Sequence, residues 1–89
     1  MVSVGWTAEA VASLDAIRSY IGLFNPDAAD RITQKLIDAA NSLSSFPSRG
    51  RPVEGALREL ATVPPYVIRY RVEGEMVVIT RIRHGRQLG

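Results

Sequence analysis

Arginine side chains, which can bind phosphate or carboxylate groups, are concentrated in the second half of this 89-residue sequence. From Pro47 onward there are eight arginines and four glutamates, a net charge of +4, whereas the first 46 residues carry three basic and five acidic residues. Arginine suits bidentate contacts with an anion better than lysine does. The second half is therefore expected to bind a negatively charged partner. The candidate binding residues are Arg49, Arg51, Arg58, Arg69, Arg71, Arg81, Arg83, His84 and Arg86.

His84, the only histidine, is the side chain near these arginines that could carry out acid–base chemistry. Several neighbouring cations would disfavour its protonated form, so it could act as a base or, beside a phosphate, as an acid in RNA cleavage. Glu54 and Glu59 are the nearby carboxylates that could complement it. The alternative is that His84 only caps the end of a strand. Both readings stay open from the sequence.

Other kinds of site lack the residues that they would need. A metal site is not expected, because the sequence has one histidine, no cysteine and no carboxylates at ligand spacing around that histidine. The sequence contains neither a G-x-S-x-G turn nor a glycine-rich phosphate loop, and we expect no cofactor. A signal-peptide pattern and a membrane-spanning apolar run are both missing. These features predict a soluble cytoplasmic protein that does not bind a membrane.

The arginines near the end of the sequence are expected to lie on a β-hairpin. Within residues 66–72 apolar side chains alternate with Arg69 and Arg71, which is the period-two pattern of a strand with one buried and one cationic face. A second β-branched segment, 76–82, follows a turn at Gly74. The pattern therefore predicts two antiparallel strands joined at that glycine.

The orientation of the second of these strands is open. Val77, Val78 and Ile79 are all apolar, so either parity could face the core. The sequence therefore does not determine the face on which Arg81 and Arg83 lie.

Two amphipathic helices are expected before the hairpin. Apolar residues recur every three or four positions over residues 8–23 and again over 26–44. Thr7 and Asn25 stand where side-chain caps are needed, and the short connection between the segments predicts an antiparallel helical hairpin.

Shorter segments complete the expected fold. Residues 2–6 alternate as a short strand, and 57–61 is another strand candidate. Segment 47–55 contains two prolines and two glycines and is expected to be a loop. We therefore predict one α+β domain, residues 1–89, in the order β-α-α-β-β-β, with the helical hairpin packed on one side of a small antiparallel sheet.

The order of these elements and a series of short motifs resemble the ParE branch of the RelE/ParE toxin superfamily over essentially the whole chain. The motifs are Trp6-Thr7, Asn25-Pro26-Asp27-Ala28-Ala29, Phe46-Pro47, Gly50-Arg51, Arg58-Glu59-Leu60, the run from Pro65 to Val72, and the run from Arg81 to Gln87. The resemblance implies the toxin of a type II toxin–antitoxin system, neutralised by a ParD-like antitoxin that wraps a disordered segment over the helices and sheet. It also implies that the free toxin acts on DNA gyrase, without being an enzyme itself.

RelE-type relatives instead cleave messenger RNA on the ribosome, using lysines and arginines on the sheet and often a tyrosine near the C-terminus. Here Arg58 and His84 match positions of that ribonuclease set. In contrast, the only lysine, Lys35, lies in the second predicted helix, Val67 stands where an arginine is usual, and no tyrosine follows Gln87. A ribonuclease that uses Arg58 and His84 is therefore the alternative, and direct nucleic-acid binding is less favoured. The first reading requires arginines that are displayed to a partner and not paired with local carboxylates.

Overall fold

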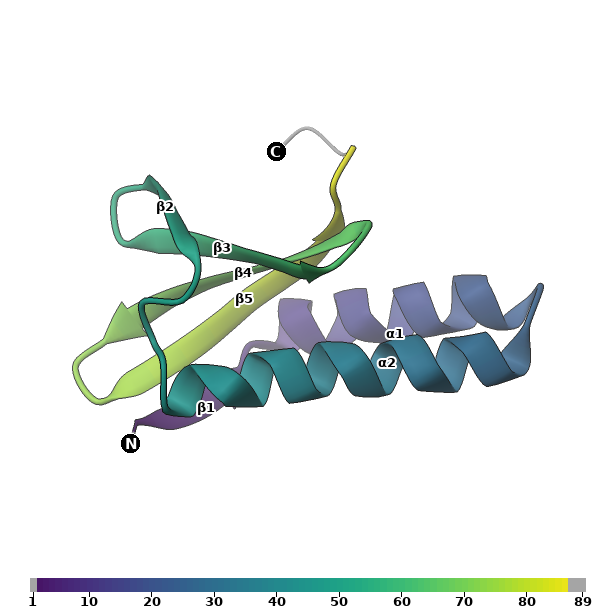
Figure 1. Cartoon of the computed structure of the whole chain (residues 1–89), viewed down its shortest axis with the longest axis horizontal. Helices are drawn as coiled ribbons and strands as arrows, with labels where there is room; N and C mark the ends of the chain where they lie inside the picture. Colours follow the sequence, from purple (N-terminus) through teal and green to yellow (C-terminus); the bar gives the residue numbers. More distant parts are fainter. Residues whose placement is uncertain (1, 87–89) are drawn as a thin grey trace.

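The computed structural model describes residues 2–86, which form two helices and a five-stranded sheet (Figure 1). The elements are β1 (Ser3–Trp6), α1 (Ala8–Gly22), α2 (Pro26–Asn41), a 3₁₀ turn (Ser42–Ser44), β2 (Arg51–Glu54), β3 (Leu57–Val63), β4 (Tyr66–Glu73) and β5 (Met76–His84). The strand order across the sheet is β1-β5-β4-β3-β2. Both helices lie on one side of the sheet, and no helix of the described residues covers its other face, here called the open face (Figure 1). Among residues 2–86, no helix has the length and apolar character of a membrane span.

Side-chain caps begin both helices, as the sequence predicts. Thr7 Oγ1 accepts a hydrogen bond from the Ala10 amide at 3.1 Å, and Asn25 Oδ1 accepts one from the Ala28 amide at 3.0 Å. The Thr7 hydroxyl also donates to the carbonyl oxygen of Thr80 at 3.1 Å. This last bond joins the start of α1 to β5 and helps to fix the helical hairpin on the sheet.

The predicted α+β class, with a helical hairpin packed on a sheet, is confirmed, and two details of the sheet differ from the prediction. β1 pairs with β5 in parallel, so the sheet is mixed and not wholly antiparallel. In addition, β2 forms within segment 47–55, which we expected to be a loop. β2 lies at the edge of the sheet, where Pro52 is tolerated because an edge strand does not need all of its N–H groups for the ladder.

The core lies between the helices and the side of the sheet that faces them. Leu36 and Ala40 of α2 are fully buried, as are Tyr70 of β4 and Val77 and Ile79 of β5, and all five belong to one apolar cluster. Burial alternates along β4 from one residue to the next. The prediction of one buried and one more exposed, cationic face for this strand is therefore confirmed.

β5 contains one extra residue that determines where its side chains point. The pairing of β4 with β5 shifts at Thr80, which forms a β-bulge. Ile79 is buried before the bulge and Ile82 after it, so neither parity faces the core along the whole strand. The shift places Arg81 opposite Arg69. The question that the three adjacent apolar residues left open is answered by a change of parity within the strand.

Candidate functional site

A row of charged side chains crosses the sheet and contains a buried carboxylate. Arg51 of β2 pairs with Glu59 of β3, Glu59 with Arg69 of β4, and Arg69 with Arg81 of β5. Residues that pair directly across neighbouring strands project from the same face of a sheet. Glu59 is 4% exposed and is the only buried charged residue in the part of the chain that the structure describes. The register thus brings guanidinium groups from different strands to one carboxylate.

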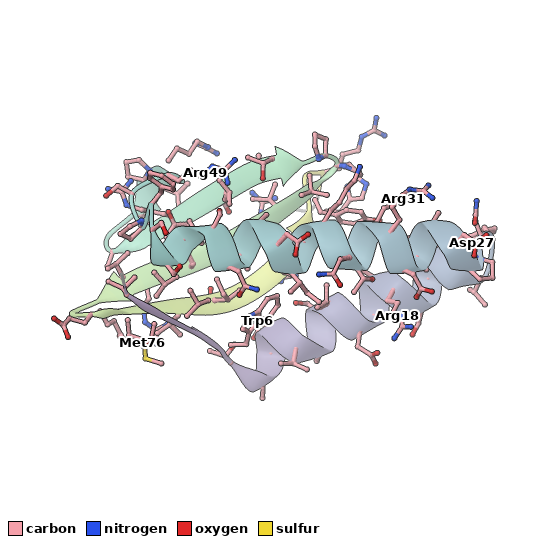
Figure 2. The ribbon with its side chains drawn as sticks, turned by 60° about the horizontal axis from the view of Figure 1, so that its bottom comes forward. Trp6, Arg18, Asp27, Arg31, Arg49 and Met76 are labelled. Carbon is pink, nitrogen blue, oxygen red and sulfur yellow. The ribbon has the colours of Figure 1, made fainter. Side chains whose placement is uncertain are left out.

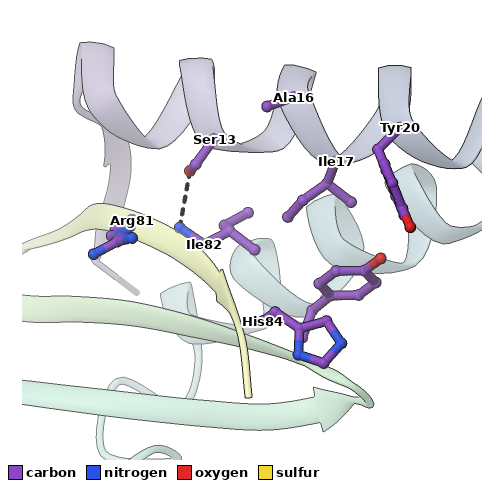
Figure 3. Close-up of a pocket in the computed structure, with 8 residues that line it drawn as sticks. Ser13, Ala16, Ile17, Tyr20, Arg81, Ile82 and His84 are labelled. Carbon is purple, nitrogen blue, oxygen red and sulfur yellow. Dashed lines mark hydrogen bonds between the residues drawn. The ribbon is translucent and has the colours of Figure 1, made fainter. Parts of the chain in front are cut away.

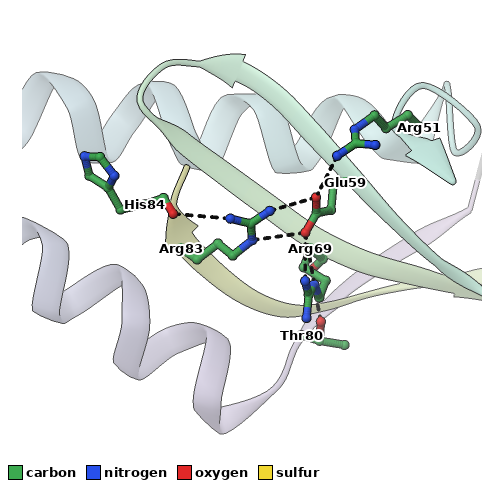
Figure 4. Close-up of polar contacts among 6 residues, drawn as sticks. All are labelled: Arg51, Glu59, Arg69, Thr80, Arg83 and His84. Carbon is green, nitrogen blue, oxygen red and sulfur yellow. Dashed lines mark hydrogen bonds and ion pairs between the residues drawn. The ribbon is translucent and has the colours of Figure 1, made fainter. Parts of the chain in front are cut away.

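Three arginines donate hydrogen bonds to Glu59 (Figure 4). Arg83 donates to both carboxylate oxygens, from Nε to Oε2 at 3.1 Å and from Nη2 to Oε1 at 2.9 Å. Arg69 donates twice to Oε2, from Nη2 at 2.9 Å and from Nε at 3.2 Å. Arg51 Nη2 lies 3.5 Å from Oε1, and the Arg51 side chain is 73% exposed. Arg69 and Arg83 therefore hold the carboxylate closely, and Arg51 holds it loosely.

These contacts keep the Glu59 carboxyl group in its charged form. The hydrogen bond from Arg83 lowers the pKa of Glu59, burial raises it, and the hydrogen bond from Arg69 lowers it again, so that the pKa lies below its ordinary value. Glu59 is therefore ionised at neutral pH. Arg51, Glu59, Arg69 and Arg83, here called the Glu59 cluster, combine three positive charges with one negative charge and keep an excess of positive charge.

The sheet arginines are less available than the sequence led us to expect. Arg69 and Arg83 are paired with Glu59, and Arg71 Nε lies 2.8 Å from Oε1 of Glu73. The expectation that these side chains would not pair with local carboxylates is therefore wrong. Glu59 lies on a strand next to Arg69 in the sheet, and Glu73 lies two residues from Arg71 on the same strand. A cationic surface nevertheless remains, since the Glu59 cluster keeps its excess charge and its Arg51 is exposed.

Arg58 and Tyr70 hold the loop between α2 and β2 against the sheet. Arg58 Nη1 donates to the carbonyl oxygens of Gly50 at 2.7 Å and Ser48 at 3.3 Å. The Tyr70 hydroxyl donates to the carbonyl oxygen of Pro47 at 2.8 Å and accepts a hydrogen bond from the Gly50 amide at 2.8 Å. The guanidinium group of Arg58 is therefore engaged with the backbone of the loop.

The His84 side chain faces a cavity beside α1 (Figure 3), while its carbonyl oxygen accepts a hydrogen bond from Nη1 of Arg83, a member of the Glu59 cluster, at 3.3 Å. The His84 ring packs edge-on against Tyr66 with the ring centroids 5.8 Å apart, and its Nδ1 accepts a hydrogen bond from the Arg86 amide at 3.1 Å. A cavity of about 270 Å³ opens here between α1 and the end of β5. It is lined by Ser13, Ala16, Ile17, Tyr20, Tyr66, Arg81, Ile82 and His84.

The structure does not bring together Arg58 and His84, the two residues of the ribonuclease alternative. Arg58 pairs with Tyr70 on one side of β4, and His84 pairs with Tyr66 on the other side. The two positions are four residues apart along β4, which is about 13 Å at the rise of a strand. Arg58 is turned toward the loop, whereas the His84 ring packs against Tyr66.

The remaining predicted residues lie at the edges of this arrangement. Arg49, in the loop before β2, donates from Nη1 to the Ser42 hydroxyl at 2.8 Å and lies at the opposite end of α2 from Asp27 (Figure 2). Arg81 is half-buried within β5, and Arg86 is exposed just after that strand. Most of the predicted site residues are therefore divided among the Glu59 cluster, the loop before β2 and the cavity beside α1, whereas Arg71 pairs with Glu73 and Arg86 follows β5.

Sequence reasoning named Glu59 only as a possible complement to His84, and it missed its position at the centre of the arginines. Glu59 and Arg69 stand at the polar positions of two strands, next to Leu60 and Ile68, which are buried. This shared parity was the available signal. This signal identifies the pairing only when the register between β3 and β4 is known, and local patterning does not supply that register.

A second feature that the sequence did not reveal is an apolar cluster where α1 ends. Tyr20, Leu23 and Phe24 are 62%, 79% and 75% exposed, and the rings of Tyr20 and Phe24 meet edge-on with centroids 5.5 Å apart. Tyr20 also lines the cavity beside His84. Clustered exposed apolar side chains of this kind mark interaction sites. We call Tyr20, Leu23, Phe24 and the adjoining cavity the α1 surface.

Comparisons with known proteins connect this structure to a family. Residues 4–89 match the family model described as ParE toxin of type II toxin-antitoxin system, parDE. Toxin RelE2 of Caulobacter vibrioides is 53% identical over 88 residues, which cover 99% of this chain and 100% of the relative. A solved chain of the chromosomal ParDE system from P. aeruginosa has a TM-score of 0.83 and 30% identity, covering 94% of this chain and 96% of that one. A chain of the RelBE2 toxin–antitoxin complex from Mycobacterium tuberculosis shares the fold, with a TM-score of 0.70, 23% identity and coverage of 93% and 96%. The chain therefore belongs to the ParE toxin family, within the ParE/RelE superfamily of type II toxin–antitoxin toxins.

Proposed function

We propose that a ParD-like antitoxin holds this toxin inactive in the cytoplasm, and that the free toxin arrests growth by inhibiting DNA gyrase. Gyrase is the target that the resemblance to the ParE branch implies, and the match of residues 4–89 to the ParE toxin family supports that branch. The observation that carries the non-enzymatic reading is the separation of Arg58 from His84 across β4. Arg58 also donates hydrogen bonds to the carbonyl oxygens of Ser48 and Gly50, so its guanidinium group is engaged with the loop before β2.

The α1 surface suits a disordered antitoxin segment. Such a segment must bury apolar side chains to offset the entropy that it loses on ordering. The α1 surface offers three exposed apolar side chains beside a cavity whose lining includes Arg81 and His84. A segment with apolar anchors and an acidic residue would satisfy both parts. That the two similar solved chains come from ParDE and RelBE2 systems supports a partner of this kind.

Phe24→Ala is expected to weaken binding of the antitoxin about 30-fold, because truncation of an aromatic anchor at an interface costs about 2 kcal/mol. Phe24 is 75% exposed, so its loss leaves the fold intact. The affinity is measured by titration calorimetry with the antitoxin encoded by the neighbouring reading frame. Val11→Ala, a matched change at a residue of α1 that is 54% exposed and outside the cavity, should alter the affinity less than about twofold. Equal effects of the two variants would exclude the α1 surface as the binding site.

Purified free toxin is expected to inhibit DNA supercoiling by gyrase in vitro, and an equimolar amount of antitoxin should restore it. Primer extension on translated messages in the presence of the toxin should show no new cleavage. If supercoiling is unaffected at every ratio of toxin to gyrase, the target assignment fails. New cuts in translated messages would instead support the RelE-type alternative.

Two arginine variants sharpen this assay. Arg51→Gln removes the most exposed cation of the Glu59 cluster and should weaken inhibition about tenfold, the loss expected for one charge-assisted contact. Arg18→Gln removes an exposed charge that is paired with Asp30 on the helical hairpin, and inhibition should be unchanged. The same loss for both variants would show that overall charge, and not the open face, decides the inhibition.

A further inference from the structure

The Glu59 cluster has the donors of an anion site, and the anion in it is the protein's own. Arg69 and Arg83 each direct Nε and Nη2 at the Glu59 carboxylate, and Arg51 directs Nη2 at it. Paired donors of a guanidinium group also match the oxygens of a phosphate. Without the carboxylate, these donors would form a site for the phosphate backbone of a nucleic acid.

The cluster also lies where a long anionic chain could reach it. No helix of residues 2–86 covers the open face (Figure 1). The side chains of Arg51, Arg69 and Arg83 are 73%, 26% and 12% exposed, whereas that of Glu59 is 3% exposed. Glu59 is thus the least exposed member of the cluster, and Arg51 is the member that solvent reaches most. A phosphate that approached the face would meet arginines that are already bonded to Glu59 (Figure 4).

We propose that Glu59 determines the specificity of the open face: its carboxylate fills the anion site of Arg51, Arg69 and Arg83 and thereby keeps nucleic-acid phosphates from binding there. An intramolecular group that is already oriented competes with a free ligand at a very high effective concentration. A phosphate that displaced Glu59 would also leave a buried carboxylate without its partners, which is strongly unfavourable. The inference goes beyond the proposed function and does not depend on it. It gives a physical reason why an arginine-rich sheet would serve a protein partner.

The test is the affinity of Glu59→Gln for a single-stranded RNA oligonucleotide, measured by fluorescence anisotropy between about 50 and 200 mM salt. Glutamine keeps the shape of the side chain and removes its charge. We expect the variant to bind RNA at least about tenfold more tightly than the unmodified toxin, with a steeper dependence on salt because more phosphates are neutralised. An affinity equal to that of the unmodified toxin would overturn the proposal.

Glu73→Gln is the matched control, because it makes the same change of charge on β4 at an exposed carboxylate that is paired with Arg71. Its RNA affinity should rise less than about twofold. An equal rise in both variants would show an effect of net charge alone and would contradict the proposal. Poly-glutamate serves as a second probe. If the affinity of Glu59→Gln for poly-glutamate rises as much as its affinity for RNA, the nucleic-acid assignment is overturned.

Glu59→Asp keeps the test decisive if Glu59→Gln folds poorly by circular dichroism, and a double variant tests the donors of the site if Glu59→Gln folds well. Glu59→Asp withdraws the carboxylate by one methylene group, so the arginines are only partly satisfied and RNA affinity should rise by an intermediate factor. Arg83→Gln combined with Glu59→Gln removes a donor of the site and should return the affinity to that of the unmodified toxin. The proposal would be refuted if the RNA affinity of Glu59→Asp did not rise, or if the RNA affinity of the double variant stayed as high as that of Glu59→Gln. Antitoxin binding and gyrase inhibition are measured separately, so either idea can fail without the other.

Discussion

Glu59→Gln is expected to lower the free energy of unfolding by about 3 kcal/mol, because breaking a buried ion pair by removing one partner leaves the other uncompensated. The carboxylate of Glu59 accepts from Arg69 and Arg83, whose guanidinium groups are largely shielded from water. Glutamine would direct its own amide donors toward these cations. Urea unfolding followed by circular dichroism measures the change. Glu73→Gln, at an exposed pair, should cost less than about 1 kcal/mol, and a similar loss in both variants would contradict the special position of Glu59.

The pH dependence of the free energy of unfolding is a second test of the same prediction. The pKa of Glu59 is lowered in the folded state, so in the pH range between the folded and unfolded values the unfolded chain binds more protons. The stabilisation is therefore complete above the ordinary glutamate pKa of about 4.3 and is lost as pH falls through the folded value. Acidification below about pH 4 should destabilise the unmodified toxin more than Glu59→Gln. Parallel stability curves for the two proteins would argue against an ionised Glu59 in the fold.

Gly50→Ala is expected to destabilise the toxin by about 2 to 3 kcal/mol, the cost of overpacking a close-packed site. An added Cβ would lie 2.7 Å from the Cε1 and hydroxyl oxygen of Tyr70 and 2.9 Å from the carbonyl oxygen of Glu59. The Tyr70 ring is buried in the core and the Glu59 carbonyl belongs to the sheet, so neither can easily move away. The loop must move instead, which breaks the bond between the Gly50 amide and the Tyr70 hydroxyl.

Gly22→Ala is the contrasting change at the end of α1. There an added Cβ would meet only the Ala29 Cβ at 3.8 Å, an ordinary contact, and alanine favours the helix by up to about 1 kcal/mol. The two glycine variants should therefore shift the urea midpoint in opposite directions. A Gly50→Ala protein as stable as the unmodified toxin would show that the loop is not packed as described.

The elements with strong local signals could be predicted from the sequence. Thr7 and Asn25 act as caps through the bonds that their positions predict, and the hairpin turns at Gly74, which has a positive φ of 58°. These features depend on residues a few positions apart. The strand β2 could not be predicted in the same way, because Pro52 argues against a strand unless its place at the sheet edge is already known.

The candidate site was only partly predictable for a similar reason. The arginines were recognised by composition, but their pairing with Glu59 depends on the register of four strands. The bulge at Thr80 is also set by packing across strands and has no local sequence pattern. The distance between Arg58 and His84 follows from their pairing on opposite sides of β4. Tertiary register, which a single sequence does not reveal, therefore determined which of the predicted residues meet.

The parallel pairing of β1 with β5 has a consequence for biosynthesis. β1 leaves the ribosome before the other described elements, yet its neighbour in the sheet is the strand that follows all of them in the sequence. Until β5 emerges, β1 and β4 each lack the neighbour that lies between them in the sheet. A nascent chain thus cannot complete this sheet until β5 has emerged, because β5 joins β1 to the strands β4, β3 and β2.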